Sequence, residues 1–317
     1  MNGQTYNGRY GKVAVLMGGR SAEREISLQT GAAILAALRR QAVDAWEIDA
    51  GETVVSDLIE GGFDRVFNAL HGRGGEDGVI QGALEALNLP YTGSGVLGSA
   101  LSMDKVRCKW IWQRLGLPTP DFILVRSEQD LDAAARELEF PLMLKPVHEG
   151  SSLGAAKVVA AEDLRQAWVN AARYDDQVIC ERWMRGGDYT VGILHGHALP
   201  AIKIETDREF YDYQAKYLDD DTRYLCPCGL PQELETELAD LALQAFDAIG
   251  AGGWGRVDIL LDENHRPGLI DVNTVPGMTG HSLVPIAANR TGLDFDNLVL
   301  RVLDTSMPAV EAAGWSR

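Results

Sequence analysis

The sequence GRVDILLDENHRPGLIDVN, residues 255–273, holds two apolar segments joined by a short polar turn. Two strands joined so closely pair antiparallel, and their side chains alternate between the two faces of the sheet. Arg256 and Asp258 therefore share a face of the first strand, and Asp271 and Asn273 share a face of the second. If these faces coincide, a guanidinium and three oxygen ligands converge, and such oxygens without His or thiolate favour a hard cation such as Mg²⁺. A polar rim on an edge hairpin is an equally good interpretation of these two strands alone.

Length and composition set broad limits on the protein. The chain has 317 residues, enough for two or three domains, and is 46% hydrophobic and 24% charged, as is typical of soluble globular proteins. Its formal net charge is −17, which argues against binding to nucleic acid or to an anionic membrane, because both rely on clustered Lys and Arg. No apolar run of roughly 18 residues is present, and the polar segment MNGQTYNGRYGK (1–12) lacks the core of a secretion signal. We therefore expect no membrane span and a cytoplasmic location.

The first third of the chain alternates strands and helices. VAVLM (13–17) is a short buried strand that ends at a Gly-Gly turn, SLQTGAAILAALRR (27–40) has helical periodicity, and RVFNAL (65–70) is a further strand. HGRGGEDG (71–78) follows that strand directly. This order predicts an open parallel α/β sheet, in which ligands bind beyond the carboxyl ends of the strands.

The rest of the chain is richer in strands. A helix opened by a capping box of Ser127 and Asp130 lies among strands at 122–125, 141–146 and 177–183, which predicts an α+β module on a mostly antiparallel sheet. Further on we expect several elements: a hairpin turning at His195-Gly196, a long polar loop over 206–227, a helix between Pro231 and Gly250, and a last amphipathic helix near 294–304.

Lys145 gives the oxygen cluster a context. It ends the apolar strand PLMLKP, where its ammonium needs an anion, and GSSLG (150–154) follows with free backbone N–H groups and two hydroxyls suited to closing over phosphates. The segment is not a P-loop, and a glycine loop alone is as typical of an ordinary hairpin. Together, the strand lysine, the glycine loop and the Asp/Asp/Asn cluster predict a site for ATP with magnesium.

The chain resembles the D-alanine–D-alanine ligases of the ATP-grasp superfamily over about residues 11–305. The resemblance implies an ATP-grasp fold, both α/β and α+β, with an N-terminal open parallel α/β domain over 1–104, a central subdomain over 105–190 and a C-terminal subdomain over 191–317. The matching motifs are GGRSAEREIS (18–27), LHGRGGEDG (70–78), YTGSG…SALSMDK (91–105), KP…EGSS (145–152), YDYQAKY (211–217), GWGRVD (253–258) and DVNTVPGMTGHSLVP (271–285).

The same resemblance implies an activity: ATP-dependent joining of two D-alanines through a D-alanyl phosphate, for peptidoglycan precursors, by a homodimer. ATP is expected between the central and C-terminal subdomains, with Lys216 on the γ-phosphate and with two Mg²⁺ (or Mn²⁺) ions held by Asp258, Asp271 and Asn273. The implied nucleotide-binding residues are Lys105, Lys145, Ser151, Ser152, Glu181, Trp183, Met184, Asp188 and Lys216. From the sequence alone, a plain strand is the favoured interpretation of VICERW around Glu181.

The remaining motifs are implied to bind the amino acids. Glu23 accepts the ammonium of the first D-alanine with help from His71, and Ser151 and Tyr217 hydrogen-bond with Glu23 across the cleft. Arg256 and the N–H of Gly277 form an oxyanion hole. The second carboxylate and the neighbouring substrate wall are assigned to Ser282, Leu283 and Tyr211. The alternative for Glu23 is an exposed carboxylate favoured by the dipole at the start of a helix.

Three positions depart from the family pattern. Asp271 and Asp188 stand where the family generally has Glu, and each is shorter by one C–C bond, about 1.5 Å. Gln214 replaces a further Glu in the segment before Tyr217. The ligand set survives, and we expect the shorter Asp271 to change how closely it approaches a cation.

Rival functions differ in the motifs that they need. Another ATP-grasp carboxylate–amine ligase would share Lys145 and the metal cluster but would lack HGRGGEDG and GMTGHSL. A D-alanine–D-lactate ligase would lack Tyr217, whose position matches the dipeptide-forming enzymes. An ATP-binding regulatory protein without turnover would lose Glu23, Ser151, Tyr217 or Arg256, and all four are present.

Overall fold

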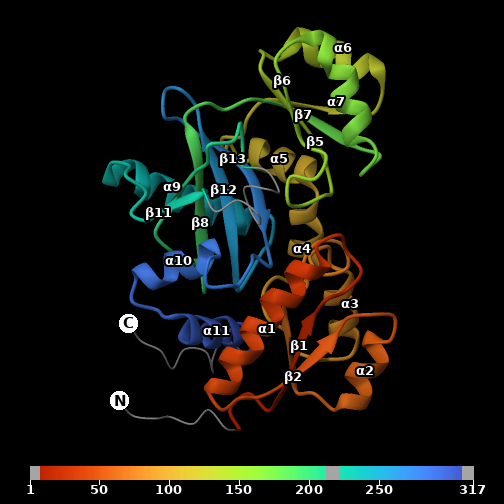
Figure 1. Cartoon of the computed structure of the whole chain (residues 1–317), viewed down its shortest axis with the longest axis vertical. Helices are drawn as coiled ribbons and strands as arrows, with labels where there is room; N and C mark the ends of the chain where they lie inside the picture. The colour runs from red at the N-terminus through yellow and green to blue at the C-terminus, as the bar shows by residue number, and fades with distance from the viewer. Residues whose placement is uncertain (1–7, 212–220, 309–317) are drawn as a thin grey trace.

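The computed structural model describes residues 8–211 and 221–308, which form three β-sheets with helices packed against them. Figure 1 shows the N-terminal sheet at one end of the molecule, the largest sheet in the middle and a smaller sheet at the other end. The fold combines a parallel α/β unit with two antiparallel sheets, as predicted.

The N-terminal sheet is parallel, with strand order β2-β1-β3. The central strand is covered on both faces, so Val13 to Met17 are all buried, which explains their continuous apolar sequence. The edge strand β2 escaped prediction because only Ala45 of DAWEID is buried. The elements of this unit are β1 (Lys12–Met17), α1 (Arg24–Arg40), β2 (Asp44–Asp49), α2 (Val54–Gly61), β3 (Arg65–Asn68) and α3 (Val79–Ala86).

Two helices lead from this unit to the small sheet. Asp104 separates them, and its side chain accepts a hydrogen bond from the backbone N–H of Arg107 at 2.8 Å, which caps the second helix. The helices are α4 (Val96–Met103) and α5 (Lys105–Arg114).

The small sheet is antiparallel, with strand order β4-β7-β5-β6, and two helices share its apolar core. The predicted capping box is present: Ser127 and Asp130 satisfy each other's backbone N–H groups at the start of α6. Its elements are β4 (Phe122–Val125), α6 (Glu128–Glu137), β5 (Leu142–Pro146), β6 (Ala156–Val158), η1 (Ala161–Asp163), α7 (Leu164–Ala171) and β7 (Val178–Arg182).

The large sheet has strand order β11-β10-β8-β12-β13, with β9 paired to β8. The predicted turn at His195-Gly196 has positive φ at both residues, as a two-residue hairpin requires. The prediction of a continuous loop over 206–227 is wrong, because Arg223–Leu225 pair with the edge of β10. Its strands are β8 (Gly187–Leu194), β9 (His197–Ala198), β10 (Ile202–Glu205), β11 (Arg223–Leu225), β12 (Trp254–Leu261) and β13 (Pro267–Asn273).

Three further helices lie in the described part of the chain, after β11. The helix predicted between Pro231 and Gly250 is present and buries Leu238, Leu241 and Ala245, and the predicted last helix is present as well. These helices are α9 (Gln232–Ala248), α10 (Leu283–Arg290) and α11 (Phe295–Asp304). Within the described parts of the chain, no helix combines the length and hydrophobicity needed to cross a bilayer.

Candidate active site

Two neighbouring cavities lie where the three sheets meet, and most of the predicted site residues line them. One has a volume of about 430 Å³ and holds the predicted substrate and oxyanion residues Glu23, His71, Ser151, Tyr211, Arg256, Gly277, Ser282 and Leu283. The other has a volume of about 170 Å³ and holds the predicted nucleotide and metal residues Lys105, Lys145, Ser151, Ser152, Glu181, Trp183, Met184, Asp188, Asp258, Asp271 and Asn273. Ser151 lines both cavities, so they adjoin at the segment GSSLG (150–154), which we call the Gly/Ser loop. Lys216 and Tyr217 lie outside the described residues.

The Gly/Ser loop connects distant parts of the chain at Ser151. The hydroxyl of Ser151 donates a hydrogen bond to the carboxylate of Glu23. Glu23 stands at the start of α1 and is only 8% exposed. Ser151 and Ser152 both adopt positive φ, an uncommon conformation for residues other than glycine, and the Ser152 hydroxyl donates to the carbonyl of Tyr211 at 3.0 Å. The predicted contact between Ser151 and Glu23 is therefore present, and Glu23 is not the exposed carboxylate of the alternative interpretation.

His71 lies beside a largely buried carboxyl group, that of Glu76, which the sequence prediction missed. Its Nε2 is 3.1 Å from the hydroxyl of Thr30, and its Nδ1 is 3.5 Å from Oε1 of Glu76. Burial raises the pKa of Glu76, while its contact with His71 acts in the opposite direction. Glu76 belongs to the HGRGGEDG segment (71–78), so this motif could have pointed to Glu76 as a site residue, whereas the amino-acid composition could not.

The predicted faces of β12 and β13 do coincide. Asp258 pairs directly with Asp271, and Arg256 pairs with Asn273. The guanidinium of Arg256 donates to both carboxylate oxygens of Asp258 at 2.8 Å, and Asn273 donates to the same carboxylate at 3.1 Å. Thr190 on β8 adds a third donor at 2.7 Å. These donors thus hold the Asp258 carboxylate oriented toward the cleft.

A β-bulge shapes the cleft end of β13. The register steps from Asp258 opposite Asp271 to Ile259 opposite Leu269, so Ile270 is an extra residue in its strand. Leu269 and Val272 remain in the core, while Ile270 and Asp271 both line the smaller cavity. A regular strand cannot present two consecutive residues to one face, so the bulge places an apolar wall and an acidic ligand side by side.

The donor set suits a magnesium ion shared with a phosphate group. Among the described residues, no three His, Cys, Asp or Glu side chains form a metal centre on their own. Mg²⁺ is commonly held by one or two carboxylates together with substrate phosphates and water. Asp258, Asp271 and Asn273 fit that pattern, and the ammonium of Lys105 lies 3.9 Å from Asp271.

A buried lysine, Lys109, stands behind the smaller cavity, which we call the nucleotide cavity; the larger one is the substrate cavity. Glu181 on β7 is almost fully buried and pairs with Lys145 at 2.7 Å and with Lys109 of α5 at 2.8 Å. Burial favours the neutral acid, but the charges and hydrogen bonds of the two lysines outweigh it and lower the pKa of Glu181 to about 2. In the structure both carboxylate oxygens of Glu181 therefore face ammonium groups, and its predicted contact with a purine stays a prediction.

The apolar side of this cavity is suited to a flat ring. Trp183, Met184 and Ile270 line it, and Asp188 lies at the same cavity. The ring of Trp183 is fixed by an edge contact with Phe210, with centroids 6.2 Å apart, and by the ammonium of Lys157 4.7 Å from its centroid.

The far wall of the larger cavity is a helix N-terminus. Ser282 precedes α10, so the N–H of Leu283 belongs to the first turn, where backbone donors and the helix dipole favour a carboxylate. The Ser282 hydroxyl accepts a hydrogen bond from the N–H of Thr279 at 2.9 Å. A Cβ at Gly277 would lie 3.1 Å from that hydroxyl, so glycine is what lets the backbone pass so close.

The three-sheet architecture, with Lys145 on a strand, Lys105 at the start of a helix and paired acids facing one cleft, defines an ATP-grasp enzyme. A family model described as "D-ala D-ala ligase C-terminus" matches residues 111–304, and one described as "D-ala D-ala ligase N-terminus" matches residues 50–94. The chain belongs to the D-alanine–D-alanine ligase family.

Similar proteins cover almost the whole chain. A D-alanine–D-alanine ligase of Ectopseudomonas mendocina is 54% identical over 300 residues, 95% of this chain and 96% of the relative. One from Methylococcus capsulatus is 55% identical over 298 residues, 94% of this chain and 96% of the relative.

Solved structures agree with the sequence relatives. A Bacillus anthracis D-alanine–D-alanine ligase in complex with ATP matches with a TM-score of 0.81 at 30% identity, over 96% of this chain and all (100%) of that one. The VanG D-Ala:D-Ser ligase of Enterococcus faecalis matches with a TM-score of 0.82 at 27% identity, over 94% of this chain and 99% of that one. The fold prediction is confirmed.

Proposed function

We propose that the chain joins two D-alanines into D-alanyl-D-alanine while ATP is converted to ADP and phosphate, and that it thereby supplies a peptidoglycan precursor. One observation carries the assignment of the site: the Gly/Ser loop joins Glu23 in the substrate cavity to the lysines of the nucleotide cavity. This arrangement suits an enzyme that brings an amino-acid carboxylate up to a terminal phosphate.

In the first step, the carboxylate of one D-alanine attacks the γ-phosphorus and forms D-alanyl phosphate. Glu23 receives the ammonium of that D-alanine, with His71 beside it, and Ser151 holds Glu23 in place. Lys105 and Lys145 offset the charge on the phosphate oxygens, a role we extend to Lys216. Two Mg²⁺ (or Mn²⁺) ions at Asp258, Asp271 and Asn273 would add charge neutralisation during phosphoryl transfer.

In the second step, the amine of the other D-alanine attacks the acyl carbon and phosphate leaves. Arg256 and the N–H of Gly277 stabilise the oxyanion, a contact worth about 3–4 kcal/mol per donor in other enzymes. The carboxylate of this D-alanine is bound by Ser282 and the N–H of Leu283 at the start of α10. Water must be excluded because it would hydrolyse the acyl phosphate, and the Gly/Ser loop, which is hydrogen-bonded to Tyr211 through Ser152, contributes that cover.

The roles of Ser152, Glu181, Trp183, Met184 and Asp188 in holding the nucleotide belong to the same proposal, as does the contact of Tyr217 with Glu23. We also propose the division into domains at 1–104, 105–190 and 191–317, a homodimer and a cytoplasmic location, all of which the family resemblance supports.

A product assay tests the function directly. The purified protein is given ATP, Mg²⁺ and D-alanine, L-alanine or D-alanine mixed with D-serine or D-lactate, and ADP and the condensed product are measured. We expect ADP release with D-alanine and not with L-alanine, and D-alanyl-D-alanine as the main product of each mixture. Preferential incorporation of D-lactate at neutral pH would contradict the proposal, and so would preferential incorporation of D-serine.

A further inference from the structure

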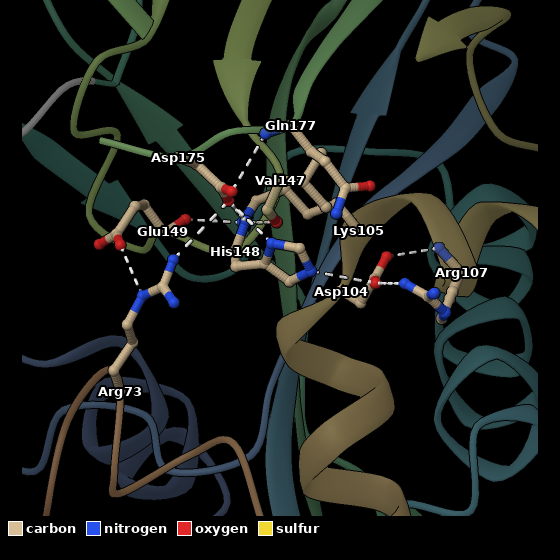
Figure 2. A network of polar contacts seen from close by, with 9 residues as sticks. All are labelled: Arg73, Asp104, Lys105, Arg107, Val147, His148, Glu149, Asp175 and Gln177. Carbon is tan, nitrogen blue, oxygen red and sulfur yellow. Dashed lines mark hydrogen bonds and ion pairs between the residues drawn. The ribbon is translucent and has the colours of Figure 1, made fainter. Parts of the chain in front are cut away.

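His148 lies between two carboxylates at the base of the Gly/Ser loop, outside the residues assigned to the reaction (Figure 2). Its Nδ1 is 2.8 Å from Oδ2 of Asp175, and its Nε2 is 3.1 Å from Oδ2 of Asp104. Its backbone N–H also donates to Asp175 at 2.7 Å. The histidine therefore joins the start of α5 to the segment that precedes β7.

This geometry requires both ring nitrogens to carry a proton. An ionised carboxylate only accepts hydrogen bonds, so a ring nitrogen that faces one must donate. Burial alone would raise the pKa of Asp104, but hydrogen bonds from His148 and Arg107 lower it to about 2, and hydrogen bonds from His148 and Gln177 likewise lower the pKa of Asp175 against burial. The hydrogen bond to Asp104, joined by that to Asp175 and opposed by burial, raises the pKa of His148. The two carboxylates thus favour the imidazolium form of His148.

The segment that His148 fixes also holds Lys105. The ammonium of Lys105 donates to the carbonyls on either side of His148, those of Val147 at 3.2 Å and Glu149 at 2.6 Å. Lys105 is only 7% exposed, so these carbonyls determine where its charge lies. The Gly/Ser loop begins one residue beyond Glu149 and carries Ser151 toward Glu23. Moving residue 148 would therefore shift both a phosphate ligand and the loop.

Other charged groups around His148 strengthen the junction. Arg73, in the loop after β3, donates to Glu149 at 2.8 Å and lies 3.8 Å from Asp175, so it reaches the junction from the N-terminal unit. Arg107 binds Asp104 from the opposite side through its guanidinium and its backbone N–H. The charges facing His148 are thus two acids, each of which has an arginine neighbour.

We propose that His148 is a positioning residue whose imidazolium, clamped between Asp104 and Asp175, holds Lys105 and the Gly/Ser loop in the geometry that binds the nucleotide. The inference rests on the proposed function. Loss of a ring proton turns one of the two hydrogen bonds into a contact between lone pairs. Because the pKa of His148 is raised, the clamp is intact below that pKa and is lost as the pH rises through it.

The first test measures ADP affinity with Mg²⁺ by calorimetry from about pH 6.5 to about pH 9, a window that covers a raised histidine pKa. Three proteins are compared: wild type, His148→Gln and His148→Arg. The affinity of the wild type for ADP should fall as the pH rises. Gln offers one donor group and no charge, so His148→Gln should bind on the order of tenfold more weakly at low pH, without the wild-type pH dependence. Arg stays charged with donors on both sides, so His148→Arg should keep its affinity across the range.

The matched control is His197→Gln. His197 is exposed on β9, so the substitution removes an imidazole without touching the junction, and the pH profile should equal that of wild type. A second readout is the titration of ¹³C-labelled imidazoles by NMR, in which the resonance of His148 should titrate above the ordinary range of a histidine side chain. The KM for the second D-alanine should be the same in all of these proteins.

The outcomes separate the two proposals. If wild type binds no ADP and makes no dipeptide, the proposed function fails. If wild type is active but His148→Gln retains the wild-type affinity and pH profile, or if His148 titrates no higher than an ordinary histidine, the positioning role is wrong. A His148→Gln protein that folds, as judged by urea unfolding, but binds ADP weakly and is matched by an active His148→Arg protein supports it.

Discussion

Replacing Lys109 by Met tests the buried charge cluster behind the nucleotide cavity. The ammonium of Lys109 is completely buried and faces three acceptors: Glu181 at 2.8 Å, the hydroxyl of Thr119 at 2.6 Å and the carbonyl of Leu269 at 3.2 Å. Met is unbranched and fills the space of the lysine stem, so the change removes a charge and its hydrogen bonds without opening a large cavity.

The size of the effect follows from what remains around Glu181. Removing one partner of a buried ion pair costs about 3–5 kcal/mol, because the other charge is left in the interior without compensation. Glu181 retains Lys145 at 2.7 Å, and the carbonyl of Leu269 retains the hydroxyl of Thr119 at 2.7 Å. The free energy of unfolding should therefore fall by about 3 kcal/mol, near the lower end of that range.

Urea-induced unfolding followed by tryptophan fluorescence measures this loss. The control is Arg165→Met, which breaks an ion pair with Glu128 in which both side chains are largely exposed, and it should change the unfolding midpoint little. Combining Lys109→Met with Glu181→Gln should cost less than the sum of the two single changes, since it leaves no buried carboxylate short of a partner. A loss below about 1 kcal/mol for Lys109→Met, the value typical of surface pairs, would refute the reasoning.

Four further changes test the site. Asp271→Asn should abolish turnover and leave the urea midpoint unchanged, and normal ADP release from that variant would overturn the metal assignment. Asp271→Glu lengthens the ligand by about 1.5 Å and should lower the Mg²⁺ concentration needed for half-maximal activity, which a metal titration measures. Ser151→Ala should raise the KM for D-alanine on the order of tenfold, because Glu23 loses a hydrogen bond to its charge; an unchanged KM would contradict this role. The lowered pKa values of Glu181 and Asp104, each about 2, mean that their stabilisation is present above about pH 4.5 and is lost as the pH falls toward 2, so urea midpoints should drop over that interval and drop less in Glu181→Gln.

Local patterns explain why much of the fold could be predicted. The short turn after Asp262 left β12 and β13 little choice but to pair, and alternation then placed Asp258 and Asp271 on one face. The capping box at Ser127 and the positive φ at His195 and Gly196 follow from residues within four positions of each other. Such features depend on residues that are close neighbours in the chain, so the local sequence is enough to predict them.

Long-range contacts explain what could not be predicted. In the sequence, Lys109 has the pattern of an exposed lysine on a helix. Only the tertiary fold brings Glu181 and Leu269 to its ammonium. His148 likewise has partners at positions 104 and 175, which no periodicity connects. The extra residue Ile270 is hidden because LID fits a regular strand and a bulged strand equally well.

The bulge at Ile270 has a consequence for inhibitors and for resistance to them. A compound that packs against Ile270 touches a wall only one residue away from the acid at Asp271. Deleting Ile270 would turn β13 into a regular strand, with Leu269 still opposite Ile259 and Asp271 still opposite Asp258, so the wall would be lost while the acid stayed in the cleft. A compound that depends on the Ile270 wall is therefore open to escape by a change at that one residue, because the acid that the reaction uses keeps its place.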